Sequence, residues 1–138
     1  MNIIFADAGF WIARRDESDQ NHELAVKLTE RILRRRATFL ITPLVFAEVH
    51  AHFSRARITR ERIIRDCWAN PVVQIEQPTF ADQSQAIELL RRHQDKTFSF
   101  CDVVSFVVML RLQVRAALSF DQHFRQFGQF TIIDETDL

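Results

Sequence analysis

Four acidic residues stand where carboxylates from distant parts of the chain can meet. Asp7 ends an apolar run near the N-terminus, and Asp121 follows another apolar run near the C-terminus. Asp102 lies in the first turn of a helix predicted to begin at Ser99, and Glu48 lies within an earlier predicted helix. Carboxylates gathered in this way bind divalent cations, and such a site suits phosphoryl and phosphodiester chemistry.

Each of the three aspartates also has a purely local explanation. Asp7 and Asp121 can cap the helical turns that follow them, because a carboxylate accepts hydrogen bonds from the free N–H groups of a helix start. Asp102 stands three residues after Ser99, which is the spacing of a capping box. Glu48 differs, because it lies inside the hydrophobic stretch 44–49. We predict that Glu48 is buried with a partner, since an isolated buried charge is very costly.

Convergence of all four acids has an energetic consequence. At spacings of ~6 Å and an effective dielectric near 20, each pair repels by roughly 3 kcal/mol, or on the order of 15–20 kcal/mol for the set. A typical domain is stable by only about 5–15 kcal/mol. Some carboxylates must therefore take up protons at raised pKa values, or a cation must lie among them. Oxygen ligands favour Mg²⁺ or Mn²⁺, which can activate water for in-line attack on a phosphodiester.

The hydrophobic pattern predicts alternating strands and helices. Short apolar runs predict strands at 2–6, 38–41, 72–75, 116–120 and 130–134. Helical spacing and helix-start signals predict helices at 8–14, 22–36, 42–56, 59–69, 78–93 and 99–112, with a short turn at 122–126. This alternation indicates an α/β fold with a mostly parallel sheet of about five strands and helices on both faces. In such sheets the functional crevice lies beyond the carboxyl ends of the strands.

Length and composition exclude several classes of protein. A chain of 138 residues suits one domain, here 1–138, and 47% hydrophobic content argues against disorder. With 2 glycines the chain has no glycine-rich phosphate loop. No apolar run reaches the ~18 residues of a membrane span, and the N-terminus does not resemble a secretory signal. Cys67 and Cys101 form no metal or disulfide pattern, so we expect a cytoplasmic protein without membrane contact.

Charge is balanced overall but clustered along the chain. The formal net charge is zero, whereas arginines gather at 34–36 and 55–65 and acids gather at 134–137. The arginine clusters are either solvated helix faces or a surface for a polyanion or an acidic partner.

Four stretches resemble the PIN-domain ribonucleases, most closely the VapC-type toxins of bacterial and archaeal toxin–antitoxin pairs. They are FADAGFWIA at 5–13, ITPLVFAEV at 41–49, SFCDVVSF at 99–106 and ALSFDQHF at 117–124. The last two and their spacing are the most specific. The resemblance covers essentially the whole chain and implies a three-layer PIN-like fold.

The resemblance also assigns roles to residues. It implies that Asp7, Glu48, Asp102 and Asp121 are the metal-binding and catalytic acids, and that Ser119 is a supporting hydroxyl. It implies an Mg²⁺- or Mn²⁺-dependent endoribonuclease that cleaves RNA, forms a homodimer and is inhibited by a cognate antitoxin. The arginines at 55–65 could then contact an RNA backbone or the antitoxin, and the sequence does not separate these.

Other polar residues near these motifs have weaker cases. His52 follows Glu48 by four residues and could share a metal site, although a histidine at the core edge is the more common role. His123 lies beside Asp121 and could contact a phosphate. Cys101 precedes Asp102, whose charge raises the thiol pKa, so Cys101 is a poor nucleophile. The 13 phenylalanines are more typical of a core than of a base-stacking surface.

Three rival functions remain at this stage. A PIN-domain nuclease in RNA processing would need the same residues without a toxin role. A catalytically inactive PIN binding module is disfavoured, because all four acids are present. A signalling receiver domain would need two adjacent acids after the first strand, whereas Asp7 stands alone there.

Overall fold

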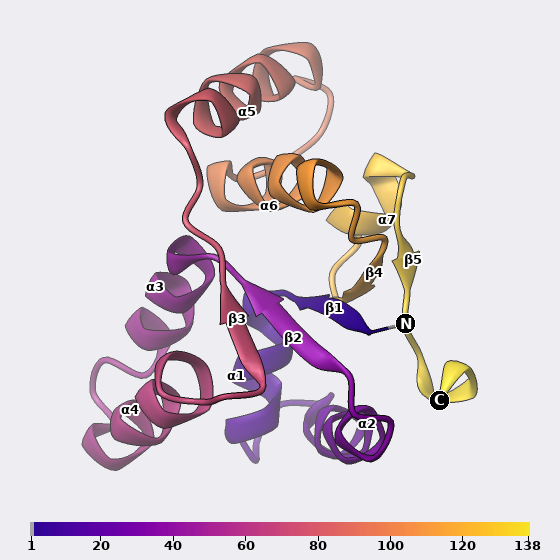
Figure 1. The fold of residues 1–138 in the computed structure, drawn as a ribbon. Coiled ribbons are helices and arrows are strands. Elements are labelled where there is room, and N and C mark those ends of the chain that lie inside the picture. Colours follow the sequence, from indigo (N-terminus) through magenta and orange to yellow (C-terminus); the bar gives the residue numbers. More distant parts are fainter. Residues whose placement is uncertain (1) are drawn as a thin grey trace.

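The computed structural model describes residues 2–138, and it has a five-stranded parallel sheet between two layers of helices (Figure 1). The strands are β1 (Ile3–Ala6), β2 (Thr38–Ile41), β3 (Val73–Ile75), β4 (Ala116–Leu118) and β5 (Thr131–Ile132). Their spatial order is β3-β2-β1-β4-β5, and every neighbouring pair is parallel. The predicted α/β class with helices on both faces is confirmed.

One helical layer is formed by the first half of the chain. It contains α1 (Ala8–Arg15), α2 (His22–Arg34), α3 (Pro43–His52) and α4 (Arg57–Ile63), which continues into a π-helical turn, η1 (Ile64–Trp68). Asp66 in η1 is buried and forms ion pairs with Arg14 and Arg15, which joins this turn to α1. The pairing of one buried acid with two arginines avoids an unpaired buried charge.

The opposite layer is formed by α5 (Phe80–Arg92), α6 (Phe100–Leu112) and α7 (His123–Phe127), and a short 3-10 turn, η2 (Glu135–Asp137), ends the chain. Helix α6 lies between the sheet and α5, and nine of its residues are buried. Its apolar character on nearly all sides follows from this position. Within residues 2–138 no helix is long and apolar enough to cross a membrane.

Helix starts are set by side-chain caps. Thr42 accepts a hydrogen bond from the N–H of Val45, and Pro43 occupies the first helical position of α3. Thr79 and Ser99 both form capping boxes, with Asp82 and Asp102 as their respective partners. These are the signals that made the helix starts predictable.

Several predicted boundaries were wrong. The predicted helix 42–56 ends at His52, the next helix begins at Arg57 rather than Thr59, and the last strand covers only Thr131–Ile132. Strand β4 ends at Leu118 rather than Phe120, because Leu118 pairs with Ala6, the last residue of β1. Beyond that point no neighbouring strand remains to pair with the chain.

The strand ends define where a site can form. After β1 the chain builds β2 and β3 on one side, and it then crosses back through α5 and α6 to place β4 on the other side of β1. The carboxyl ends of β1 and β4 are therefore at the switch point of the sheet, where ligand sites form in open α/β folds. Asp7 directly follows β1 and Ser119 directly follows β4.

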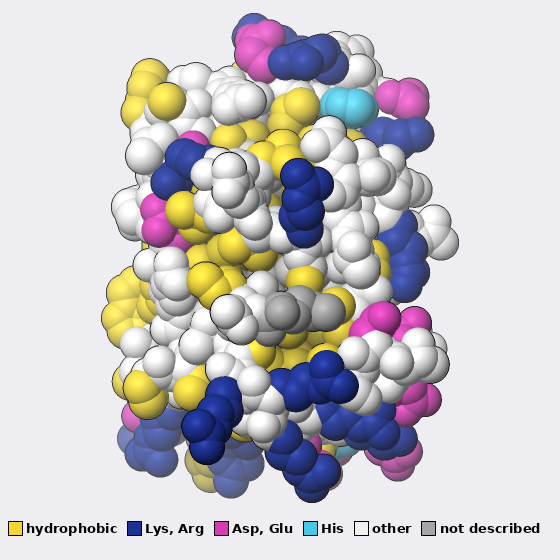
Figure 2. Space-filling model, turned by 45° about the vertical axis from the view of Figure 1, so that its right-hand side comes forward, with side chains coloured by type: hydrophobic (Ala, Val, Ile, Leu, Met, Phe, Trp, Pro, Cys, Tyr) yellow, Lys and Arg dark blue, Asp and Glu magenta, His cyan; other side chains and the backbone are white. Residues whose placement is uncertain are grey.

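The acidic cluster at 134–137 is paired with basic residues of α2 that lie outside the two arginine clusters. Lys27 on α2 forms an ion pair with Glu135 in η2, and Arg31 donates a hydrogen bond to the carbonyl oxygen of Glu135. Figure 2 shows basic and acidic side chains intermixed at the lower end of the face that it presents. The acidic C-terminal tail is thus held against the basic helix α2.

Aromatic side chains fill the core between α6, α7 and the sheet. Phe106 is fully buried, and its ring centroid lies 4.5–5.7 Å from those of four others: Phe98, Phe124, Phe127 and Phe130. This arrangement supports the expectation that these phenylalanines form a core.

We predict that Phe106→Ala lowers the free energy of unfolding by about 3–5 kcal/mol, because it leaves a cavity inside this cluster. Phe80→Ala is the matched control: Phe80 is 86% exposed, and we expect a change within about 0.5 kcal/mol. Urea unfolding followed by circular dichroism measures both. Similar losses for the two variants would contradict the core assignment.

Candidate metal centre

Asp7 lies at the switch point and is held in place on both carboxylate oxygens. Its Oδ1 accepts a hydrogen bond from the N–H of Ala8 at 2.8 Å, and its Oδ2 accepts one from the hydroxyl of Ser119 at 3.1 Å. Its backbone N–H donates to the carbonyl oxygen of Leu118, which ties β1 to β4 at this point. Ser119 therefore contacts Asp7 directly, and its supporting role at a metal site stays a prediction.

Burial of Asp7 gives its carboxyl group unusual electrostatics. The side chain is almost inaccessible, and this desolvation raises the pKa of Asp7 to about 8, with the charges of Asp121 and Asp102 adding to the effect. The hydrogen bonds from Ala8 and Ser119 act in the opposite direction. Without a compensating cation, Asp7 thus favours its neutral form at pH 7.

Asp102 lies in the first turn of α6, where its charge acts on Asp7. It completes the predicted capping box: its N–H donates to Ser99 Oγ at 3.0 Å, and its Oδ2 accepts from the N–H of Ser99 at 2.9 Å. Among residues 2–138, Oδ1 accepts no hydrogen bond. Capping therefore holds the carboxylate in place and leaves one oxygen for a ligand.

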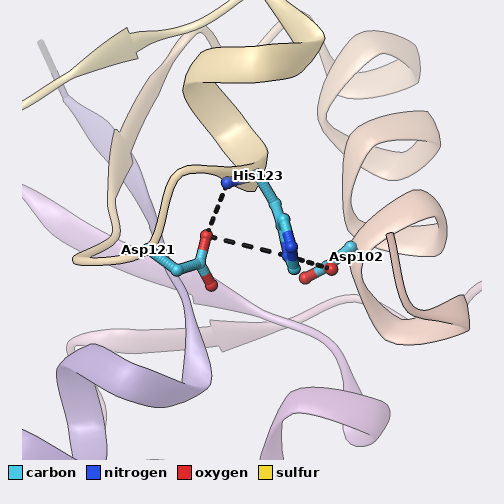
Figure 3. A group of neighbouring side chains, drawn as sticks. All are labelled: Asp102, Asp121 and His123. Carbon is cyan, nitrogen blue, oxygen red and sulfur yellow. Dashed lines mark hydrogen bonds and ion pairs between the residues drawn. The ribbon is translucent and has the colours of Figure 1, made fainter. Parts of the chain in front are cut away.

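Asp121 and His123 complete the group from the loop after β4 and the start of α7. Asp121 Oδ1 accepts a hydrogen bond from the N–H of His123 at 2.8 Å, which is the local cap that the sequence allowed. The His123 ring turns back, and its Nδ1 lies 2.7 Å from Asp102 Oδ2 and 3.9 Å from Asp121 Oδ1 (Figure 3). One ligand atom from each of these three residues lies within 4.8 Å of the others.

Glu48 reaches the site from α3, but the prediction that it is buried was wrong. The side chain is exposed, because α3 buries Val45 and Val49 and turns Glu48 toward solvent. Partial desolvation raises the pKa of Glu48, with contributions from the charges of Asp102 and Asp121, while a hydrogen bond with the Cys101 thiol lowers it. The coupling to both aspartates places Glu48 in the same electrostatic cluster.

The structure thus brings all four predicted acids into one electrostatic cluster, with Asp102 and Asp121 in its tightest part. No Lys or Arg within residues 2–138 forms an ion pair with any of the four. The sequence offered helix capping and convergence as alternative explanations of the three aspartates. In the structure the aspartates cap helix starts and also lie near one another. The donor set, together with the uncompensated negative charge, fits a hard divalent cation.

His123 is the residue whose importance the sequence underestimated. The sequence suggested that His123 could contact a phosphate, which stays a prediction, and the structure places its imidazole between Asp102 and Asp121. The Asp121-x-His123 spacing was the available signal, and the distance to Asp102 depends on how α7 packs against α6.

The remaining candidates lie outside the metal group. The exposed His52 has its Nε2 3.8 Å from Asp16 Oδ2, so Asp16 is its ionic partner. Cys101 is buried, and desolvation first, then the charges of Glu48, Asp7 and Asp102, raise its thiol pKa above the usual range. The thiol therefore stays protonated, as predicted, although burial contributes more than Asp102.

Comparison with known families identifies this arrangement. The family model of the PIN domain matches residues 4–129. The chain therefore belongs to the PIN-domain family, as its sequence motifs predicted.

Individual relatives agree with this assignment. The chain is 28% identical over 127 residues to the 23S rRNA-specific endonuclease VapC20 from two strains of Mycobacterium tuberculosis, over 91% of this chain and 95% of the relative. It is also similar to the crystal structure of Mycobacterium tuberculosis VapC20, a Sarcin-Ricin loop cleaving toxin, with a TM-score of 0.84, 27% identity, and coverage of 95% and 98% of the two chains. VapBC2 from Rickettsia felis, bound to a promoter DNA fragment, shares the fold with a TM-score of 0.70 at 9% identity, over 95% of this chain and 97% of that one.

The raised pKa of Asp7 predicts how stability depends on pH in metal-free protein. An unfolded aspartate titrates near ~3.9, whereas folded Asp7 titrates at about 8. The folded state therefore binds the Asp7 proton more tightly than the unfolded state does. The stabilisation that this protonation gives the folded state is lost as the pH rises from about 4 to about 8. Asp7→Asn removes the titration and keeps the shape of the side chain.

We expect the difference in unfolding free energy between Asp7→Asn and the unaltered chain to grow in favour of the variant over that pH range. Urea unfolding at a series of pH values in EDTA measures this difference. Parallel stability curves would contradict the assignment of the raised pKa.

Proposed function

We propose that this chain is an endoribonuclease that hydrolyses RNA phosphodiester bonds at the crevice beyond β1 and β4. Mg²⁺ or Mn²⁺ would be held by Asp7, Asp102 and Asp121, with Glu48 at the rim. The observation that carries this proposal is the convergence of Asp7 with Asp102 and Asp121 in a PIN-domain chain, without a Lys or Arg partner among residues 2–138.

The surroundings of each residue suit it to a different role in the reaction. Asp7 and Asp102 are fixed by backbone N–H groups and by Ser119, so their oxygens are positioned before any ligand arrives. Glu48 is exposed and has a raised pKa, which suits a carboxylate that orients the attacking water and accepts its proton. When bound, the cation supplies the positive charge that activates water and stabilises the leaving oxygen. No protein nucleophile is needed, and the protonated Cys101 does not provide one.

The relatives support a biological role as well as a reaction. VapC20 is a 23S rRNA-specific endonuclease and a toxin, and its likeness to this chain extends over nearly the full length of both. We therefore propose that this chain is the toxin of a VapBC-type pair, a homodimer inhibited by a cognate antitoxin protein. The proposed RNA substrate implies a cytoplasmic location, and 23S rRNA is the first substrate to test. The main alternative is an RNA-processing nuclease without a toxin role.

Substitution of Asp102 by Asn tests the reaction. The variant removes one negative charge from the tightest part of the group, and we expect RNA cleavage to fall at least about a hundredfold, since metal assistance is worth several kcal/mol. Asp95→Asn is the control, because Asp95 is exposed and, among residues 2–138, forms an ion pair with Lys96 alone. Purified RNA and gel analysis of the products measure cleavage, and circular dichroism confirms folding. Unchanged cleavage by folded Asp102→Asn protein would reject the proposal.

Growth on induced expression tests the biological role. We expect expression of the chain to arrest growth, the Asp102→Asn variant to leave growth unaffected, and co-expression of a short neighbouring reading frame to restore it. Colony counts after induction provide the measurement. Normal growth with active, soluble enzyme would favour the RNA-processing alternative.

A further inference from the structure

The imidazole of His123 lies against two of the proposed metal-binding carboxylates. Its Nδ1 lies 2.7 Å from Asp102 Oδ2 and 3.9 Å from Asp121 Oδ1, so it faces both carboxylates at once (Figure 3). The ring packs edge-on against Phe98 with centroids 5.7 Å apart, which fixes the plane of the imidazole. The ring is thus held with one nitrogen directed into the proposed metal site.

The other ring nitrogen has a partner outside the site. Nε2 lies 3.1 Å from the hydroxyl oxygen of Thr97, which can accept a hydrogen bond from an Nε2–H group. In the tautomer in which Thr97 accepts from Nε2–H, Nδ1 carries a free lone pair. A histidine that binds a metal characteristically donates its second ring N–H to a neighbouring acceptor, which fixes the tautomer in this way.

The buried nitrogen itself lacks a hydrogen bond. Nδ1 is inaccessible to solvent, and within residues 2–138 no neighbour forms a hydrogen bond of acceptable geometry with it, although Asp102 is close. Buried polar atoms in folded proteins nearly always have a partner. One ligand atom each from His123, Asp102 and Asp121 lies within 4.8 Å of the other two, and in the Nε2–H tautomer all three carry lone pairs that can bind a cation.

From this geometry, and resting on the proposed metal-dependent function, we propose that His123 Nδ1 is a direct ligand of the cation beside Asp102 and Asp121. The site is then a mixed nitrogen and oxygen site. Mg²⁺ prefers oxygen ligands only, whereas an imidazole ligand favours transition metals, and Mn²⁺ also accepts carboxylates. The chain therefore selects Mn²⁺ over Mg²⁺, and His123 is responsible for this preference.

Electron spin-echo modulation of Mn²⁺ bound to the full-length chain tests the ligand directly, because a coordinated imidazole nitrogen modulates the echo. We compare the unaltered chain with His123→Asn, which offers an oxygen in place of the nitrogen, and with His52→Ala, which removes a histidine paired with Asp16. We expect nitrogen modulation in the unaltered chain and in His52→Ala, and none in His123→Asn.

Calorimetric titration with MnCl₂ and MgCl₂ measures selectivity. We expect His123→Asn to weaken Mn²⁺ binding by about tenfold or more and to change Mg²⁺ binding less. Thr97→Val keeps His123 but removes the acceptor for Nε2–H, and we expect weaker Mn²⁺ binding there too. Thr97→Val also serves as the test variant if circular dichroism shows that His123→Asn does not fold.

The contrary outcomes separate this inference from the proposed function. Bound Mn²⁺ without nitrogen modulation, or tighter Mn²⁺ binding by His123→Asn, would overturn the role of His123; the second result would show that the ring is a competing internal cation. Either result is compatible with metal-dependent RNA cleavage that requires Asp102. Full RNA cleavage in EDTA would instead overturn the proposed function.

Discussion

Mutual repulsion among carboxylates is the constraint on which the rest of the structure depends. Asp7, Asp102 and Asp121 are brought to one crevice by elements that are far apart in the sequence. The apolar sheet and the buried helix α6 supply the free energy that holds them together, because their burial does not depend on the state of the acids. The clustered carboxylates therefore favour a bound cation, and this preference is the basis of the proposed chemistry.

The same hydrogen bonds serve folding and function. The cap of α1 fixes Asp7, the capping box of α6 fixes Asp102, and the turn before α7 fixes Asp121. Each cap orients a carboxylate that would otherwise lose side-chain entropy on binding a ligand. The local and functional explanations of these aspartates are therefore complementary, and preorganisation of the site follows from helix initiation.

Much of this arrangement could be predicted from the sequence, because its signals are local. Apolar runs marked the strands, Thr42-Pro43 and Ser99 marked helix starts, and the order of elements required a parallel sheet. Strand lengths could not be predicted, because β4 ends where its neighbour β1 ends. The metal-binding roles of the four acids remain predictions, although the structure places the acids together.

The wrong burial of Glu48 and the unforeseen contact of His123 with Asp102 have one cause. The apolar neighbours of Glu48 suggested burial, but α3 packs through only one of its faces, and Val45 and Val49 occupy that face. His123 approaches Asp102 only because α7 packs against α6. Both depend on how one helix lies against its neighbours, which a single sequence does not specify.

The most direct test of the central claim is anomalous diffraction from crystals of the unaltered chain grown with Mn²⁺. The account predicts one strong anomalous peak in the crevice, within bonding distance of carboxylate oxygens from Asp102 and Asp121 and near Asp7. A crevice without a peak at saturating Mn²⁺, with these carboxylates bonded only to backbone N–H groups and to Ser119, would contradict it.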